Sequence, residues 1–200
     1  MIKQPLLVGK KLSLRPFEAS DIGEEYLGWL NDPEVTRYLG VGREPVTLES
    51  VRRYVERFQH STTDLLFAII DRKTNKHIGN VTLNHIHPIH RTADTGLMIG
   101  DKAFWGKGYA FETWTLLIDF AFTQLGLRKI IAGAVAGHEG SLLVLKRLGF
   151  RQEGVFRGEF FLDGIYLDTL RMGLFQREFK KPDKEIQAEP WTSASLPLKS

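Results

Sequence analysis

Apolar and polar positions along the chain predict a set of short strands with four helices between them. Strands are predicted where short apolar or alternating runs are bounded by polar turns, at residues 11–16, 65–71, 77–85, 95–100, 129–135, 150–161 and 165–175. Helices are predicted where apolar residues recur three or four positions apart, at residues 21–30, 48–58, 110–125 and 141–148. Ser20, Thr47 and Ser141 are the residues expected to cap the helices at their N-termini.

The order of these elements predicts one domain of the α/β (α+β) class. One strand is followed by two helices, a run of strands, a helix, a strand, a helix and two strands, which is typical of a mixed sheet flanked by helices. We assign residues 1–179 to this domain. Residues 180–200 contain prolines, lysines and serines without periodicity, so we expect a C-terminal tail outside the core, with Trp191 as its candidate anchor.

A glycine-containing loop between a strand and a helix is the feature with the clearest chemistry. The apolar run 95–100 leads into Phe104-Trp105-Gly106-Lys107-Gly108-Tyr109-Ala110, after which helical spacing begins. This arrangement would point several unpaired backbone N–H groups in one direction, which favours an anion such as phosphate. A plain tight turn is the alternative. The spacing fits neither the dinucleotide fingerprint nor the P-loop.

Composition narrows the function classes. The 200 residues carry a net charge of +3, and 42% are hydrophobic, as in an ordinary soluble domain; this charge does not imply nucleic-acid binding. The absence of cysteine excludes disulfides, so we expect a protein of the reducing cytoplasm. It also excludes an acyl-cysteine intermediate, so an enzyme of this sequence that used a thioester would transfer the acyl group directly. We find no signal sequence and no apolar run that could cross a membrane.

The glycine loop and several further segments resemble the GNAT superfamily of N-acetyltransferases, in its RimJ/RimL-like branch. The loop pattern Gln/Arg-x-x-Gly-x-Gly/Ala is matched with Trp105 in its first position. Segments elsewhere agree in order, over roughly residues 10–178: Leu14-Arg15-Pro16-Phe17, residues 29–35, residues 138–150, and Asp163-Gly164 followed by Asp168. The resemblance implies a mostly antiparallel, splayed central sheet, acetyl-CoA as acetyl donor, no metal, and acetylation of an amine.

The resemblance also implies coenzyme-binding residues. They are the loop residues Trp105, Gly106, Lys107, Gly108, Tyr109 and Ala110, the strand residues Met98 and Ile99, and His138, Ser141 and Lys146, with Arg147 as the alternative to Lys146. Two positions depart from the family pattern. His138 replaces an asparagine that usually helps to hold the pantetheine arm, and Leu145 occupies the position of a tyrosine that protonates the leaving thiolate.

Acetyl transfer needs a polarised thioester carbonyl, a neutral amine and a proton donor for the thiolate. We expect Asp94 to act as the base, directly or through water, with a solvated carboxylate or an ion pair with Arg91 as the alternative. We expect Ser141 to protonate the thiolate, although a helix-capping role would also explain it. Trp29, Tyr38, His85 and His87 are candidates for the acceptor side; core packing and a bystander loop are their alternatives, and zinc binding by the histidines is disfavoured.

The acceptor itself stays open between several amines. A peptide N-terminus or an amino sugar suits the aromatic and histidine residues, and a polyamine ranks last because no dense carboxylate cluster is visible. We expect no nucleic-acid or membrane partner, and a homodimer is compatible with the sequence. A protein that binds acyl-CoA without turnover, as a sensor or interaction module, is the alternative, because the chain lacks both Asn at 138 and Tyr at 145.

Overall fold

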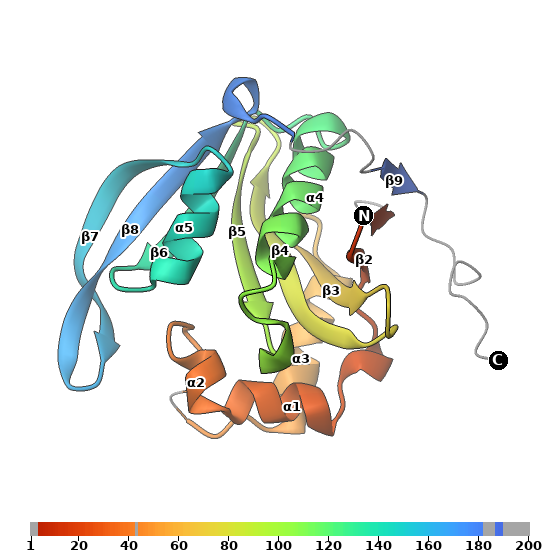
Figure 1. The fold of residues 1–200 in the computed structure, drawn as a ribbon, viewed down its shortest axis with the longest axis vertical. Coiled ribbons are helices and arrows are strands. Elements are labelled where there is room, and N and C mark those ends of the chain that lie inside the picture. Colours follow the sequence, from red (N-terminus) through yellow and green to blue (C-terminus); the bar gives the residue numbers. More distant parts are fainter. Residues whose placement is uncertain (1–3, 43, 182–186, 190–200) are drawn as a thin grey trace.

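A nine-stranded sheet runs through the middle of the molecule (Figure 1). The computed structural model describes residues 4–42, 44–181 and 187–189. In it the strands lie in the order β7-β8-β6-β5-β4-β3-β2-β1-β9. Their bounds are β1 Leu6–Val8, β2 Leu12–Pro16, β3 Leu65–Asp71, β4 His77–His87, β5 Thr92–Ile99, β6 Lys129–Val135, β7 Arg151–Leu162, β8 Ile165–Phe175 and β9 Gln187–Glu189. Within the described part of the chain β5 and β6 are parallel and the other neighbours are antiparallel, which confirms the predicted mixed, mostly antiparallel sheet.

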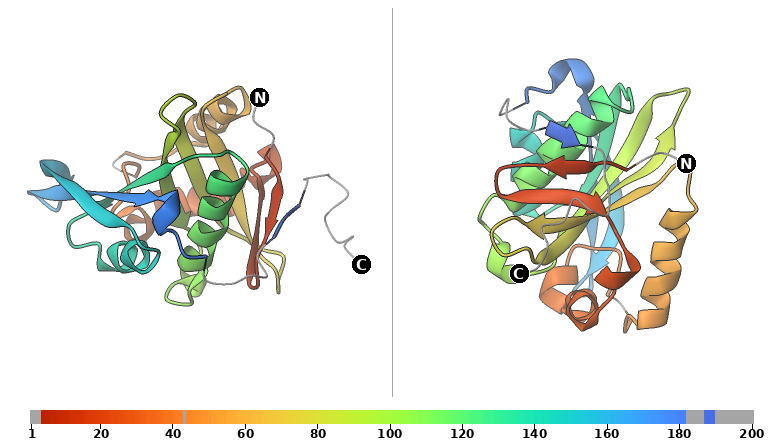
Figure 2. Two further views of the ribbon diagram at one scale, coloured as in Figure 1. Left: turned by 90° about the horizontal axis from the view of Figure 1, so that it is seen from above. Right: turned by 90° about the vertical axis from the view of Figure 1, so that its right-hand side faces the viewer.

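Helices cover both faces of this sheet. Their bounds are α1 Glu24–Asn31, α2 Pro33–Thr36, α3 Leu48–Gln59, α4 Tyr109–Thr123 and α5 Glu139–Arg147, with short 3-10 turns at Ala19–Asp21, Lys102–Phe104 and Gln176–Glu178. Figure 2 shows α4 and α3 on opposite sides of the sheet. None of the helices in the described residues is long and apolar enough to span a bilayer.

Two hydrophobic clusters bind these layers together. The cluster on the α4 side contains Leu117 and Phe120 with the inward residues of β2 to β6, and the cluster on the other side contains Val55, Trp29 and Leu66. Because side chains of a strand alternate between faces, the neighbouring residues Leu66 and Phe67 of β3 belong to different clusters. The all-buried pattern of β3 therefore reflects a strand covered on both faces.

One predicted helix start was wrong, and the following segment holds an additional short helix. Ser20 does not cap the first helix: Asp21 pairs with Arg15 of β2, and α1 begins only after Gly23. The helix ends at Asn31, close to its predicted end, and Pro33 starts α2, whose N-cap Asp32 accepts a hydrogen bond from the Glu34 N–H. Thr47 caps α3 as predicted, through the Ser50 N–H.

The two ends of the chain add strands that periodicity did not predict. Leu6–Val8 pairs with β2, and Gln187–Glu189, inside the predicted tail, pairs with β1. Each strand has three residues, too few to show an alternating pattern. Trp191, the proposed anchor of the tail, lies outside the described residues.

The sheet divides into a fork between β5 and β6. These parallel strands are paired only from Thr92–Thr95 to Lys129–Ala132. Beyond that point β5 continues beside β4 as far as Ile99, while β6 continues beside β8 as far as Val135. The remaining residues of β5 and β6 are not paired with each other, so N–H groups along the inner edges of the fork are available to a ligand, whereas the Ile99 carbonyl accepts a hydrogen bond from Trp105 Nε1.

Candidate active site

The loop before α4 forms a cradle of backbone amides. Gly106 and Gly108 have φ angles of 70° and 83°, a left-handed conformation that glycine adopts without strain, and Gly108 is the N-cap of α4. Among the described residues, no protein acceptor takes a hydrogen bond from the N–H groups between Gly106 and Phe111; the first helical bond is donated by Glu112 N–H to Gly108 O, at 3.2 Å. The cradle therefore has the free amides and the helix dipole that an anion requires.

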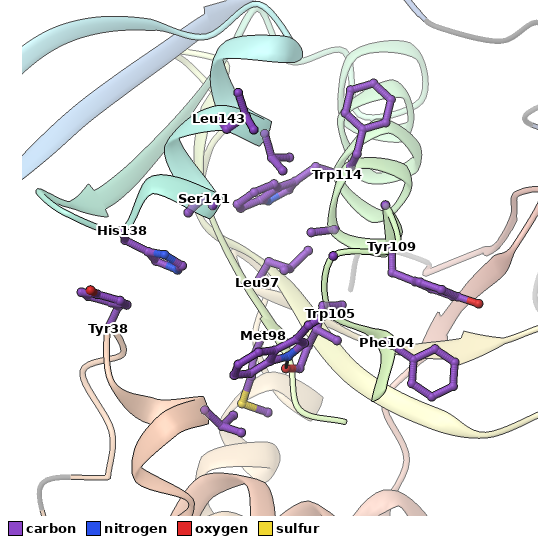
Figure 3. A pocket seen from close by; sticks show the side chains of 18 of the residues that line it. Tyr38, Leu97, Met98, Phe104, Trp105, Tyr109, Trp114, His138, Ser141 and Leu143 are labelled. Carbon is purple, nitrogen blue, oxygen red and sulfur yellow. Dashed lines mark hydrogen bonds between the residues drawn. The ribbon is translucent and has the colours of Figure 1, made fainter. Parts of the chain in front are cut away.

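The first turn of α5 faces this cradle across the fork. His138 is the N-cap residue of α5, and Ser141 is the third residue of the helix rather than its cap. The ring of His138 stacks on Tyr38, with ring centroids 4.5 Å apart (Figure 3). Burial lowers the pKa of His138, so its ring is neutral at pH 7.

A cavity of about 600 Å³ lies between these elements and the edge of β5. Figure 3 shows Leu97 and Met98 on its floor, α5 residues on one side, and Trp105 and Tyr109 on the other. Ten of the residues predicted from the sequence line it: Tyr38, Met98, Ile99, Trp105, Gly106, Gly108, Tyr109, Ala110, His138 and Ser141. The tertiary structure thus brings together residues that are a hundred positions apart in the chain.

Six predicted residues do not line the cavity. Lys107 and Lys146 point elsewhere, although their neighbours line it. Trp29 is a core residue: its indole packs so closely on Gly100 that an added Cβ there would lie 2.1 Å from the ring. His85 and His87 lie at the far end of β4, and Asp94 near the start of β5.

The histidine cluster and Asp94 have other contacts. His87 stacks on His90, with centroids 4.1 Å apart, and His85 Nδ1 lies 3.9 Å from Asp94 Oδ2. Asp94 Oδ1 accepts a hydrogen bond of 2.8 Å from Arg171 Nη2, so its partner is Arg171. In the part of the chain that the structure describes, no three His, Cys, Asp or Glu side chains gather as a metal site.

Two residues that we did not single out lie at the site, and one of two alternatives is favoured there. Leu97 lines the cavity from β5, and Arg147, the alternative to Lys146, lines it from α5, with its guanidinium carbon 4.2 Å from the Phe111 ring centroid. Ser141, Val144 and Arg147 are spaced three apart and share one face of the helix, to which Lys146 does not belong. Lys11 donates a 2.7 Å hydrogen bond to Lys107 O, which only the fold could reveal.

Charges around the cavity are paired. Lys102 Nζ lies 2.7 Å from Asp32 Oδ2 and 2.9 Å from Glu34 Oε2, and these carboxylates raise the pKa of Lys102 to about 12.

Burial, with the hydrogen bond to Asp71, raises the pKa of Tyr109 to about 12. The phenol of Tyr109 therefore remains protonated over the physiological range, and its bond to Asp71 anchors the start of α4 to β3.

Comparison with known proteins agrees with this geometry. Residues 11–151 match the family profile of the acetyltransferase (GNAT) domain. The chain belongs to the GNAT family. It is 30% identical over 177 residues to the uncharacterized N-acetyltransferase p20 of Bacillus licheniformis, covering 86% of this chain and 97% of that protein. It is 29% identical to the spermidine N(1)-acetyltransferase of Escherichia coli K12, covering 84% and 88%.

A solved structure shares the whole fold. The crystal structure of spermidine N-acetyltransferase from Vibrio cholerae in complex with CoA and spermine superposes with a TM-score of 0.77 at 27% identity, covering 85% of this GNAT chain and 98% of that chain. The fold and the enzyme class expected from the sequence, an N-acetyltransferase, are confirmed. The residue roles within the site stay predictions.

Proposed function

We propose that this chain transfers the acetyl group of acetyl-CoA directly to a primary amine of a peptide N-terminus or an amino sugar. The observation that carries the proposal is the cradle of free amides from Gly106 to Phe111, placed beside an open fork in the sheet. Acetyl-CoA supplies the activated thioester. The amides and the N-terminus of α4 would hold the diphosphate of the coenzyme. Arg147, beside Phe111, would bind the outer phosphate of the coenzyme.

Backbone N–H groups of β5 would polarise the thioester carbonyl. Gly100 N–H donates to Ile78 O, and alternation along an antiparallel pair then directs the Met98 N–H toward β4. The same alternation turns the N–H groups of Leu97 and Ile99 toward the fork. Of the two residues predicted from the sequence, Ile99 therefore keeps the role and Leu97 replaces Met98. The Ile99 carbonyl already accepts a 2.7 Å hydrogen bond from Trp105 Nε1, which fixes this edge against the loop.

The proposed base and acid lie on opposite faces of the sheet. Asp94 shares its face of β5 with Met98, which packs on the α1–α3 side, whereas Ser141 belongs to α5 on the other side. An amine that approaches the fork from the Asp94 side would lose its proton there, directly or through water. Its nitrogen would attack the thioester carbon, the C–S bond would break, and Ser141 would supply a proton to the thiolate on the α5 side.

The charges of the cavity favour the two proposed acceptors over a polyamine. Relatives named spermidine acetyltransferases make a polyamine an acceptor that must be tested. In this chain, however, the one carboxylate among the described lining residues is Glu34, which is paired with Lys102, and Arg37 on the same lining is paired with Asp163. The described lining therefore offers a polycation no unpaired carboxylate to offset the cost of burying its charges.

A coenzyme sensor without turnover is the second candidate. It is favoured by Leu145, which is fully buried and has no proton to donate where the family pattern has a tyrosine. The sensor predicts coenzyme binding with no amine-dependent thiol release. Because the chain has no cysteine, a thiol reagent reports released CoA without background from the protein.

The decisive variant is Ala110→Glu, with Ala110→Gln as its neutral control. Residue 110 is the second residue of α4, where a glutamate suits the helix dipole and should not harm folding. The added carboxylate would, however, occupy the amide cradle and repel a diphosphate. We expect coenzyme affinity to fall at least a hundredfold in Ala110→Glu and less than tenfold in Ala110→Gln, measured by calorimetry. Equal affinities in the two variants would refute the cradle assignment.

A further inference from the structure

Two glycines mark the opening of the fork. Gly96 of β5 and Gly133 of β6 directly follow the last bonded pair of these strands, Thr95 with Ala132, and both glycines are exposed. Neither backbone conformation nor close packing requires glycine at these two positions. Neither has a positive φ, and an added Cβ would come no closer than 3.4 Å to another residue, Thr82 Oγ1 at Gly96 and Arg171 Nη1 at Gly133.

Glycine inside a strand is unfavourable, and it often marks a place where a ligand approaches the backbone closely. The two positions lie on the same face of the sheet as Asp94, because Gly96 is two residues further along β5 and Gly133 pairs with Arg171 across β6 and β8. This is the face opposite α4 and α5. The bare backbone there leaves room for an acceptor to reach the fork.

Arg171 lies beside this opening, and only one nitrogen of its guanidinium donates a hydrogen bond to another described residue. Its Nη2 donates to Asp94 Oδ1 at 2.8 Å, and its guanidinium carbon lies 5.5 Å from the Phe156 ring centroid. No acceptor among the described residues takes a hydrogen bond from its Nε or Nη1. The side chains of Arg171 and Asp94 are each about one-third exposed, at 31% and 32%. A fixed positive charge and a fixed negative charge are thus presented next to each other.

We propose that Arg171 is a specificity residue that selects an acceptor carrying a carboxylate or phosphate close to its amine. The inference rests on the function proposed above and narrows its acceptor. The anionic group of such an acceptor would meet the free edge of the guanidinium, which binds carboxylates and phosphates in a fork geometry, while the amine would lie at Asp94. A polyamine would place a cation against Arg171 instead.

The test compares matched acceptors that differ in one anionic group. The probes are a peptide amide beginning Asp-Ala against one beginning Asn-Ala, glucosamine 6-phosphate against glucosamine, and spermidine, with CoA release as the readout. We expect the wild-type protein to prefer an anionic member over its neutral partner by at least tenfold in kcat/KM. Arg171→Gln should reduce that ratio to about one, mainly through KM, and Arg171→Lys should retain part of it. The two pairs distinguish a carboxylate from a phosphate.

Matched variants separate specificity from structure. Arg177→Gln removes another arginine that lies over a phenylalanine ring, that of Phe175 at 4.8 Å, and should leave the ratio unchanged. Gly133→Ala should keep the melting temperature and the coenzyme affinity but raise the acceptor KM. A wild-type preference for the neutral members or for spermidine, or a ratio that survives Arg171→Gln, overturns the inference alone. Coenzyme binding without turnover of any amine overturns the proposed function with it.

Discussion

His77 illustrates how a single residue acquires its properties from its surroundings. It begins β4, and its ring lies among Phe17, Tyr26 and Trp29, with centroid separations of 5.5, 5.7 and 5.2 Å. Its Nε2–H donates a 2.8 Å hydrogen bond to Gly79 O. Burial in this aromatic cluster disfavours the charged ring and lowers the pKa of His77 below its ordinary value. The neutral form is the one that the folded state holds.

This lowered pKa predicts a pH-dependent stability. Below the unfolded pKa of about 6.5 the unfolded chain binds a proton that the folded chain resists, so acidification destabilises the protein until the folded pKa is reached. Above the unfolded pKa neither state binds this proton, and the stabilising contribution of the neutral His77 is fully present. We expect the free energy of unfolding in urea to fall as the pH is lowered below about 6.5, and His77→Gln, which keeps a donor for Gly79 O, to flatten that dependence. An unchanged slope in His77→Gln would show that other groups cause it, with His138 as the next candidate.

Residue identities predicted much of the candidate site. The glycines at 106 and 108 indicated the cradle, because only that spacing before a helix frees several amides at once. Trp29 was assigned to the acceptor side by its type and segment, yet it packs on Gly100 in the core. A tryptophan has the same chemistry in a core and in a pocket, so sequence could not distinguish the two. The partner of Asp94 also escaped prediction, because Arg171 is distant in the chain.

At the scale of elements, the hairpin of β4 and β5 depends on one close backbone approach. Gly79 pairs with Ile99, and a Cβ added to Gly79 would lie 2.1 Å from Met98 O, a main-chain atom that cannot move aside cheaply. The hairpin places Leu97, Met98 and Ile99 at the floor of the cavity. Distortion at Gly79 would therefore be transmitted to the edge of the fork.

We predict that Gly79→Ala destabilises the protein by about 2 kcal/mol or more, as overpacking in a close contact does. Gly154→Ala is the matched control, because Gly154 is also a strand residue and no atom lies within 4 Å of its added Cβ. The control should be neutral or slightly stabilising, since alanine loses less conformational entropy than glycine. Urea denaturation of both variants measures the difference; equal stabilities would contradict the expected clash between a Cβ at residue 79 and Met98 O.

Turn and helix-start positions differ in how well the sequence predicts them. Asp163-Gly164, between the predicted strands 150–161 and 165–175, is a typical sequence for a tight hairpin turn, and both residues have positive φ angles, 50° and 85°, as such a turn requires. By contrast, α1 begins after Gly23 because Asp21 accepts hydrogen bonds from Arg15, a residue of β2. Local pattern predicts an element where the turn chemistry is local, and fails where a side chain from another element decides.

At the scale of the whole molecule, one sheet carries both hydrophobic clusters. Leu117 of α4 belongs to the cluster on one face, and Leu66 of β3 belongs to the cluster on the other. Residues of β3 and β5 occur in both clusters, so the two faces share these strands. Neither layer therefore has a core that could persist once the sheet separates.

We predict that Leu117→Ala and Leu66→Ala each destabilise the entire protein in a single transition. Each substitution removes a fully or almost fully buried leucine, with exposures of 0% and 2%, and should lower the free energy of unfolding by about 2–5 kcal/mol. Far-UV circular dichroism and tryptophan fluorescence should report the same midpoint in each variant. Separate midpoints for the two probes would mean that the faces unfold independently.

The sequence by itself determined the class of the fold, the position of the glycine loop before α4 and the enzyme family, because these depend on periodicity and on short motifs that are local in the chain. The tertiary structure decided which of the predicted residues meet. It paired β5 with β6 over only four positions on each strand, and the resulting fork separates Asp94 from Ser141 by the thickness of the sheet. It also placed Arg171 against Asp94. Contacts of this kind join residues far apart in the chain, and no local pattern specifies them.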